Sequence, residues 1–314
     1  MRPWLPFIAA TDAAAEAAWV AALQAAMPGE QVVPLAQLDA AARAACTVAI
    51  VANPRPQDLR SLPRLRWVHS VWAGVERLLA ELGDTDLTIV RLIDPQLADT
   101  MAEAVLAWTL FLHRDMPRYA SQQRARQWRP LDYVRPQDKT VALLGLGALG
   151  EAAARRLVAA GFRVQGWSRS PRSLPGLHCE AGDAGLAPTL AGADIVVCLL
   201  PLTAPTRGLL NDAAFSQLTR PAALINFARG AVVDDAALRR ALDGGRLSHA
   251  VLDVFATEPL PADSWHWTHP AVTVLPHVSA PTNRTTAAAI VAAHVAAYRR
   301  DGSLPPSVDR SRGY

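Results

Sequence analysis

Short apolar runs alternate with helix-forming stretches along most of the chain. In the first third, four runs rich in β-branched and large apolar residues predict strands at residues 6–10, 47–53, 65–73 and 87–92. Helix formers fill the segments between them, as in "DAAAEAAWVAALQAAM" at residues 12–27. Strand–helix alternation of this kind predicts a parallel sheet with helices on both faces.

A second alternating series follows a long apolar helix that begins near Met101. It holds six further strand candidates, at residues 140–147, 162–167, 193–201, 222–230, 248–255 and 272–278. Six strands in one unit suit a dinucleotide-binding domain. The predicted fold class is therefore α/β with two Rossmann-like domains. A doubly wound coenzyme domain (101–280) is inserted into a flavodoxin-like substrate domain, which is built from residues 1–100 and from the alanine-rich helix and tail at 281–314.

Composition and charge narrow the class of protein. The 314 residues are 51% hydrophobic and 19% charged, with a net charge of +3 and scattered basic residues, so no nucleic-acid-binding stripe is expected. No run reaches the ~18–20 uncharged apolar residues of a membrane span. Cys46, Cys179 and Cys198 lie far apart, which predicts reduced thiols and no metal site. We expect a soluble, cytoplasmic protein.

A glycine fingerprint follows the first strand of the second series. "GLGALG" places Gly145, Gly147 and Gly150 at G-x-G-x-x-G spacing, with Ala148 and Leu149 between the last two. Such glycines allow a tight turn, close approach of the backbone to a pyrophosphate, and close helix–strand packing. The first N–H groups of the following helix would hold the phosphates. A Gly-rich turn without a ligand is the alternative.

Ser168 directly follows the next predicted strand (162–167), at the position where an NAD-binding protein of this kind carries Asp. Arg169 follows directly, and Arg172 is close in sequence. An Asp would accept hydrogen bonds from a ribose 2′-hydroxyl and repel a 2′-phosphate, whereas a hydroxyl and guanidinium groups suit a dianionic phosphate. The sequence predicts NADP(H) in preference to NAD(H). The alternative is a solvated arginine with no effect on coenzyme choice.

Three chemically active side chains follow apolar strands of the second series. They are Arg229 in "NFARGAVVDD", Glu258 in "DVFATEPLP" and His277 in "VLPHVSAPT". Taken singly, each has an ordinary structural explanation: Arg229 as a surface arginine, Glu258 as a loop carboxylate and His277 as a buried histidine. Loops at the carboxyl ends of parallel strands border the coenzyme crevice, so together they predict a catalytic group.

These motifs resemble those of the D-isomer-specific 2-hydroxyacid dehydrogenases over essentially the whole chain. The matching segments are residues 70–79, 143–150, 167–173, 199–211, 226–238, 252–261, 272–282 and 308–314. Within that family the chain is most similar to the reductases of glyoxylate and hydroxypyruvate. The resemblance implies an NADPH-dependent reductase that forms glycolate and D-glycerate. A dehydrogenase of a bulkier 2-oxoacid and, from another class, a non-catalytic NAD(P)-sensing protein are the alternatives.

The resemblance also assigns roles to individual residues. Arg229 would bind the substrate carboxylate and polarise the carbonyl, His277 would donate the proton, and Glu258 would orient the histidine and favour its charged form. Asp253 would contact the nicotinamide carboxamide. Further coenzyme contacts implied by the same motifs are Leu200, Pro201 and Thr206.

In the first domain, the resemblance points to a loop that grips the substrate carboxylate. Backbone N–H groups of Ala73, Gly74 and Val75 would be the donors, and Trp72 would either narrow the pocket or pack in the core. The 101–135 region, with its Arg-rich stretch, corresponds to the family's dimer arm and implies a homodimer. Trp128 would reach the partner's pocket or pack within the interface.

Overall fold

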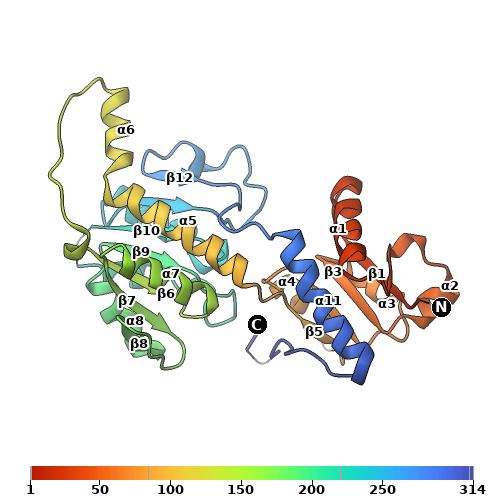
Figure 1. Cartoon of the computed structure of the whole chain (residues 1–314). Helices are drawn as coiled ribbons and strands as arrows, with labels where there is room; N and C mark the ends of the chain where they lie inside the picture. Colours follow the sequence, from red (N-terminus) through yellow and green to blue (C-terminus); the bar gives the residue numbers. More distant parts are fainter. Residues whose placement is uncertain (1, 84, 220, 311, 314) are drawn as a thin grey trace. The chain divides into compact units, whose positions relative to one another are not determined.

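The computed structural model describes residues 2–83, 85–219, 221–310 and 312–313. The chain divides into two compact units (Figure 1). Unit 1 combines residues 1–96 with residues 282–314, and unit 2 is residues 97–281. The two parallel sheets confirm the predicted α/β class with two Rossmann-like units. No helix among the described residues is long and apolar enough to cross a membrane.

Unit 1 contains a five-stranded sheet in the order β2-β1-β3-β4-β5, and all of its pairings are parallel. Its strands are β1 (Trp4–Ala9), β2 (Gln31–Pro34), β3 (Val48–Ala52), β4 (Trp67–Ser70) and β5 (Thr88–Val90). Its helices are α1 (Ala13–Ala26), η1 (Leu35–Gln37), α2 (Ala40–Ala45), α3 (Pro56–Arg60), α4 (Glu76–Leu82) and α11 (Arg284–Asp301).

Successive side chains along the strands of unit 1 point to opposite faces of the sheet. Phe7 and Ile50 pack in one buried cluster with Leu23 of α1 and Val291 of α11. The next residues along the strands face a second cluster that α2, α3 and α4 cover. The last helix therefore completes the core of the N-terminal sheet, although about 190 residues separate them in sequence.

Unit 2 contains a seven-stranded parallel sheet in the order β12-β11-β10-β9-β6-β7-β8. Its strands are β6 (Thr140–Leu144), β7 (Arg163–Ser168), β8 (His178–Ala181), β9 (Ile195–Cys198), β10 (Ala222–Asn226), β11 (Leu247–Leu252) and β12 (Val272–Val274). Its helices are α5 (Pro95–His113), α6 (Met116–Arg124), η2 (Pro136–Asp138), α7 (Ala148–Ala159), α8 (Gly182–Ala191), α9 (Asp212–Ser216), η3 (Gly230–Val232), α10 (Asp235–Asp243) and η4 (Trp265–Trp267). The chain reverses direction across the sheet between β6 and β9, which is the topological switch point of such folds.

Two strands were absent from the expectations, and both have a physical reason. β2 and β8 each lie at an edge of a sheet and are four residues long. β8 ("HCEA") has no buried residue, and β2 buries only Val32. These two edge strands leave most of their side chains partly in water, so their hydrophobic pattern is weak.

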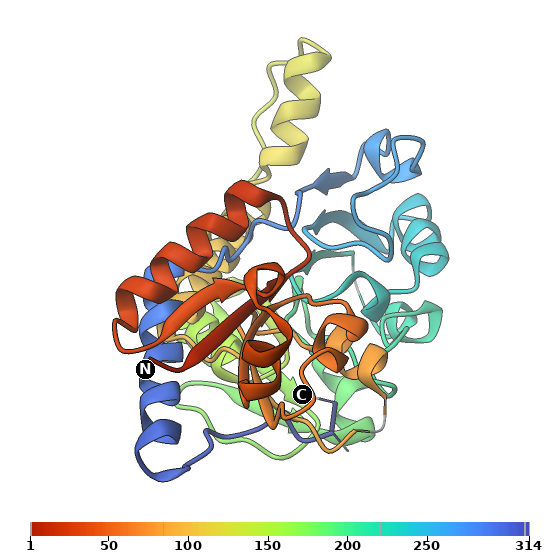
Figure 2. The same ribbon diagram turned by 90° about the vertical axis from the view of Figure 1, so that its right-hand side faces the viewer.

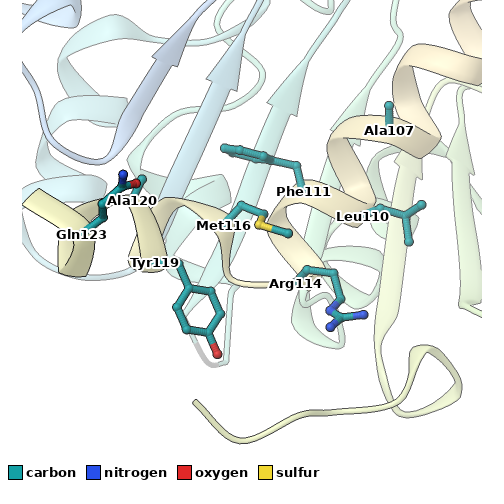
Figure 3. Close-up of a pocket in the computed structure, with 8 residues that line it drawn as sticks. All are labelled: Ala107, Leu110, Phe111, Arg114, Met116, Tyr119, Ala120 and Gln123. Carbon is teal, nitrogen blue, oxygen red and sulfur yellow. The ribbon is translucent and has the colours of Figure 1, made fainter. Parts of the chain in front are cut away.

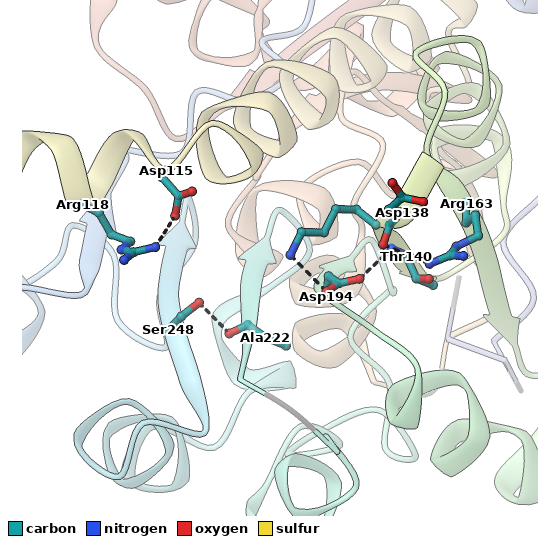
Figure 4. A network of polar contacts seen from close by, with 9 residues as sticks. Asp115, Arg118, Asp138, Thr140, Arg163, Asp194, Ala222 and Ser248 are labelled. Carbon is teal, nitrogen blue, oxygen red and sulfur yellow. Dashed lines mark hydrogen bonds and ion pairs between the residues drawn. The ribbon is translucent and has the colours of Figure 1, made fainter. Parts of the chain in front are cut away.

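A polar network fixes the middle of the unit 2 sheet at its amino end (Figure 4). Asp194, just before β9, accepts from the backbone N–H of Thr140 at 2.8 Å and from Lys139 Nζ at 3.2 Å. These bonds hold β6 beside β9, where the switch point lies. The network is at the edge opposite to the loops that carry the predicted site residues.

Candidate active site

The loops that follow the strands of unit 2 leave the sheet side by side at its carboxyl edge. Each first loop residue is tied to the neighbouring strand by a backbone hydrogen bond. The bonds run from Gly145 to Trp167 (2.8 Å), Leu199 to Leu144 (2.8 Å), Phe227 to Cys198 (3.1 Å), Asp253 to Asn226 (3.1 Å) and Leu275 to Leu252 (2.8 Å). The predicted coenzyme residues and the predicted catalytic residues thus share one edge of one sheet.

The glycine loop between β6 and α7 has the geometry that its spacing predicted. Gly145 has φ +105°, and a Cβ there would lie 2.9 Å from the backbone oxygen of Leu199. A Cβ on Gly150 would overlap the carbonyl of Gly145. A Cβ on Gly147 would meet nothing within 4 Å, so the backbone at this exposed position is open to a ligand.

The start of α7 fits a pyrophosphate. The helix begins at Ala148 after Gly147, and no side chain caps its first turn. Ala148 is exposed and Leu149 half-buried. Uncapped N–H groups and the positive end of a 12-residue helix dipole form an anion site, and the open backbone of Gly147 gives access to it. The residues present therefore fit the phosphates of a dinucleotide.

The carboxyl end of β7 lies beside this loop. Ser168 ends the strand, and its hydroxyl donates to the carbonyl of Ser170 at 2.7 Å. Arg169 and Arg172 are both exposed in the following turn. No carboxylate stands between residues 168 and 173. With two arginines and no carboxylate, this turn suits a phosphate better than a ribose diol.

The loop after β9 is held by a threonine. Thr206 donates from Oγ1 to the carbonyl of Pro201 at 2.7 Å and accepts from the N–H of Thr203 at 2.8 Å. Leu200, in the same loop, is buried. The thiol of Cys198 ends β9 fully buried, and burial raises its pKa to about 12, so it cannot act as a thiolate nucleophile at this edge.

Arg229 follows β10 in a loop that the side chain of Asn226 braces. Asn226 Oδ1 accepts from the N–H of Ala228 at 3.2 Å, and its Nδ2 donates to the carbonyl of Arg229 at 3.3 Å. The Arg229 guanidinium is half-buried and donates from Nη1 to the carbonyl of Ala228 at 2.7 Å. These hydrogen bonds therefore fix the backbone around Arg229.

His277 and Glu258 form a direct pair. His277 Nδ1 lies 2.8 Å from Glu258 Oε2, and the side chains are 51% and 35% exposed. The other carboxylate oxygen, Oε1, accepts from the N–H of Phe255 at 2.9 Å. Since a carboxylate can only accept, the Nδ1–H of His277 is the donor, and Nε2 is left for chemistry.

Asp253 shapes the turn that carries the histidine. Its side chain is buried, and its two oxygens accept from the N–H groups of Val278 at 2.7 Å and Ser279 at 2.9 Å. His277 has φ +55°, in the left-handed region that non-glycine residues rarely adopt. This role of Asp253 was not predicted from the sequence, and its contact with the nicotinamide stays a prediction.

Gly230 brings two loops together and was also missed. A Cβ at this position would overlap the backbone of Phe255 and Ala256. The backbone after Arg229 thus touches the backbone that leads to Glu258, and only glycine permits this approach. A close backbone contact of this kind has no signal in the hydrophobic pattern.

The predicted carboxylate-binding loop lies in unit 1, after β4. The N–H of Trp72 donates to Ser70 Oγ at 3.0 Å, and its carbonyl accepts from Leu92 at 3.1 Å. The Trp72 ring packs edge-on against Trp19, 5.7 Å between centroids, as part of the core. Ala73 and Gly74 are half-buried and Val75 is buried. Their role as donors, and a role of Trp72 in a pocket, stay predictions.

Comparisons with known proteins give a family match and several similar proteins. Residues 106–279 match the model of the NAD-binding domain of D-isomer-specific 2-hydroxyacid dehydrogenases. The chain is 37% identical to glyoxylate/hydroxypyruvate reductase A of Serratia proteamaculans, over 85% of this chain and 87% of that protein. It is 33% identical to the protein of the same name from Klebsiella pneumoniae strain 342, over 94% and 96% of the two chains.

Two solved structures show the same fold over the whole chain. A D-isomer-specific 2-hydroxyacid dehydrogenase from Xanthobacter autotrophicus, in complex with NADPH and MES, superposes with a TM-score of 0.92 at 38% identity and covers 100% of both chains. An NADPH-dependent glyoxylate/hydroxypyruvate reductase from Sinorhizobium meliloti, in complex with NADP and sulfate, gives a TM-score of 0.91 at 35% identity over 99% of this chain and 100% of the other.

Proposed function

We propose that this chain, which belongs to the D-isomer-specific 2-hydroxyacid dehydrogenase family and is therefore an oxidoreductase, reduces glyoxylate to glycolate and hydroxypyruvate to D-glycerate with NADPH. The observation that carries the proposal is the His277–Glu258 pair, 2.8 Å apart at the sheet edge that also presents Arg229 and the glycine loop.

A 2-oxoacid presents two groups that Arg229 suits. The guanidinium forms charge-assisted hydrogen bonds with the carboxylate and polarises the adjacent carbonyl oxygen. Backbone N–H groups of Ala73, Gly74 and Val75 are further donors for the carboxylate in this proposal. Small side chains at the first two positions leave the backbone accessible.

The reduction needs a proton at the carbonyl oxygen as the C2 carbon gains a hydride. Bound NADPH supplies the hydride. His277, protonated on both ring nitrogens, donates the proton from Nε2 to the oxygen and becomes neutral. Glu258 keeps its hydrogen bond to Nδ1 throughout, so it orients the ring and its negative charge stabilises the charged form. In the oxidation direction the neutral Nε2 takes the proton back.

The decay of NADPH absorbance at 340 nm with a panel of 2-oxoacids tests the function. We expect turnover with glyoxylate and hydroxypyruvate and weaker turnover as the side chain grows. A clear preference for bulkier acids would favour the alternative dehydrogenase. Tight NADPH binding without turnover of any acid would contradict the proposal and favour an NAD(P)-sensing protein.

The turn after β7 sets the coenzyme preference in this proposal. Substituting Arg169→Asp removes a cation and adds an anion beside the proposed 2′-phosphate. We expect the preference for NADPH over NADH, as a ratio of kcat/KM, to fall by about 10- to 100-fold, because a hydrogen bond to a charged group contributes about 1.5–3 kcal/mol. The ratio is measured by the same assay with each coenzyme.

Arg163→Asp is the matched control, since Arg163 is an exposed arginine at the amino end of the same strand. Its variant should keep the wild-type ratio. An unchanged ratio in Arg169→Asp would show that this turn does not read the phosphate.

We also propose a homodimer formed through the 101–135 region. Helix α6 projects from the rest of unit 2 in two perpendicular views (Figures 1 and 2). Large exposed hydrophobic side chains gather in this region: Leu110, Met116, Tyr119, Trp128, Tyr133 and Val134. A monomer would leave this apolar surface in water, whereas a second copy would bury it.

A hollow of about 600 Å³ between α5 and α6 belongs to the same surface (Figure 3). Its lining includes the large apolar side chains of Leu110, Phe111, Met116 and Tyr119. Light scattering after size exclusion should give twice the 33.6 kDa of one chain. A mass of one chain at micromolar concentration would contradict the dimer.

We place the enzyme in the cytoplasm. All three cysteines are unpaired, and two of them, Cys46 and Cys198, are buried. Unpaired thiols are typical of a reducing compartment.

A further inference from the structure

The loop between β11 and β12 must hold Glu258 still, yet most of it is in water. Residues 256–259 and 261–263 are exposed. Glu258 has one contact with the backbone of its own loop, the 2.9 Å bond from Phe255 N–H to Oε1. The position of Phe255 therefore determines where the carboxylate lies relative to His277.

Phe255 is fixed from the far end of the same loop. Its ring packs edge-on against the ring of His266, with 5.2 Å between centroids. His266 is 4% exposed, and its Nδ1 lies 2.8 Å from Ser264 Oγ. The Trp265 ring stacks on it at 4.0 Å. A buried histidine thus supports the residue whose N–H holds Glu258.

Asp235 of helix α10 secures this pair of rings. Its Oδ2 accepts from Trp265 Nε1 at 3.2 Å, and its Oδ1 lies 3.0 Å from His266 Nε2. The second contact does not meet hydrogen-bond criteria, so it is a close polar contact. The proximity of His266 holds the pKa of Asp235 below its usual value, although partial burial opposes this.

Other charged groups around the rings come from the same helix. Arg239 lies over the Trp265 ring at 5.6 Å, and Asp243 Oδ1 lies 3.2 Å from His269 Nε2. Helix α10 is itself firmly placed. Asp234 caps it by accepting from Ala237 N–H at 2.8 Å, and its apolar side, including Leu238, is buried against the sheet.

We infer that Asp235 is a positioning residue for the His277–Glu258 pair. It joins the loop of Glu258 to the helix that follows the loop of Arg229, through Trp265, His266 and Phe255. The inference rests on the proposed function, because it assigns Glu258 and His277 their roles in proton transfer. Asp235 contacts neither substrate nor coenzyme in this account.

Substitution Asp235→Asn tests the inference. An amide keeps one oxygen and replaces the other with an NH₂ group, so it cannot keep both the hydrogen bond from Trp265 Nε1 and the close contact of an oxygen with His266 Nε2. The deciding readout is the tautomer of neutral His277, observed in long-range ¹H–¹⁵N spectra and assigned by its loss in His277→Gln. In the wild type, Glu258 selects the Nδ1–H tautomer. In Asp235→Asn, we expect a measurable population of the Nε2–H tautomer. Glu258→Ala, which lacks the carboxylate, should give the largest population of this tautomer.

Kinetics supply the second readout. We expect kcat to fall by about 10-fold, as for other residues that orient a functional group indirectly, while the dissociation constant of NADPH stays within about twofold. Trp265→Phe removes one donor to Asp235 and keeps the stacked ring, so it should give a smaller change in the same direction. It also tests the inference if Asp235→Asn does not fold.

Asp212→Asn is the matched control. Asp212 lies in α9, and its exposed carboxylate pairs at 2.6 Å with Arg240 of α10, the helix that carries Asp235. The substitution removes this carboxylate without changing the loop of Glu258. Its His277 tautomer should be that of the wild type. An unchanged tautomer in Asp235→Asn and Trp265→Phe would overturn the inference, even if their melting temperatures fell. Since the NMR readout needs no turnover, failure of the inference and failure of the proposed function are distinguishable.

Discussion

Replacing His277 with alanine lowers kcat for reduction of glyoxylate by about 10²–10⁴-fold, the usual contribution of a positioned general acid. Without the imidazole, water must supply the proton to the carbonyl oxygen. NADPH binding should change little, because the glycine loop and the turn after β7 hold the coenzyme in this account. Single-turnover kinetics at saturating NADPH measure the chemical step directly.

The chain offers a matched control for this substitution. His178 also pairs with a glutamate, since its Nε2 lies 2.8 Å from Glu180 Oε1, but both residues belong to the edge strand β8. His178→Ala should keep wild-type turnover. If His277→Ala retained more than about a tenth of the wild-type kcat, the histidine would not be the proton donor.

Replacing Arg229 with lysine lowers kcat/KM by about 10²–10³-fold, which is the typical loss when a donor to a developing oxyanion is removed. Lysine keeps the positive charge but loses the planar fork that binds a carboxylate and reaches the carbonyl at once. The loss should appear in both KM and kcat, since the arginine binds the ground state and stabilises the transition state.

Arg246→Lys is the corresponding control. Arg246 also donates from Nη1 to a backbone carbonyl, that of Leu218, at 2.7 Å. It lies just before β11, at the amino edge of the sheet. Its variant should keep the wild-type kcat/KM. Equal kinetics for Arg229→Lys and the wild type would remove Arg229 from the chemistry.

Much of the fold follows from the apolar pattern, and the exceptions have a common cause. The central strands are buried on both faces, as β3 and β10 are in full, so each is a continuous apolar run. Predicted strands run past the observed ends, as residues 193–201 do around β9 (Ile195–Cys198), because apolar loop residues such as Leu200 stay buried beyond the sheet. The two strands that were not predicted, β2 and β8, carry no such buried run.

The candidate site shows a similar division. The placement of Arg229, Glu258 and His277 at one sheet edge could be predicted, because each lies in a loop that follows an apolar strand and has a reactive side chain. The groups that hold them could not be predicted. Gly230 and Asp235 act through contacts with residues 25 to 31 positions away in sequence, and such contacts depend on how two loops meet at the sheet edge. The hydrophobic periodicity of the sequence carries no information about such contacts between loops.

The central claim is that this protein delivers hydride from NADPH to the carbonyl carbon of a 2-oxoacid with His277 as the acid. The most direct measurement uses NADPH with deuterium at both C4 positions, glyoxylate as substrate and NMR of the product. One deuterium at C2 of glycolate, formed rapidly by the wild type and far more slowly by His277→Ala, is the predicted result. Glycolate without deuterium, or NADPH that stays intact, would contradict it.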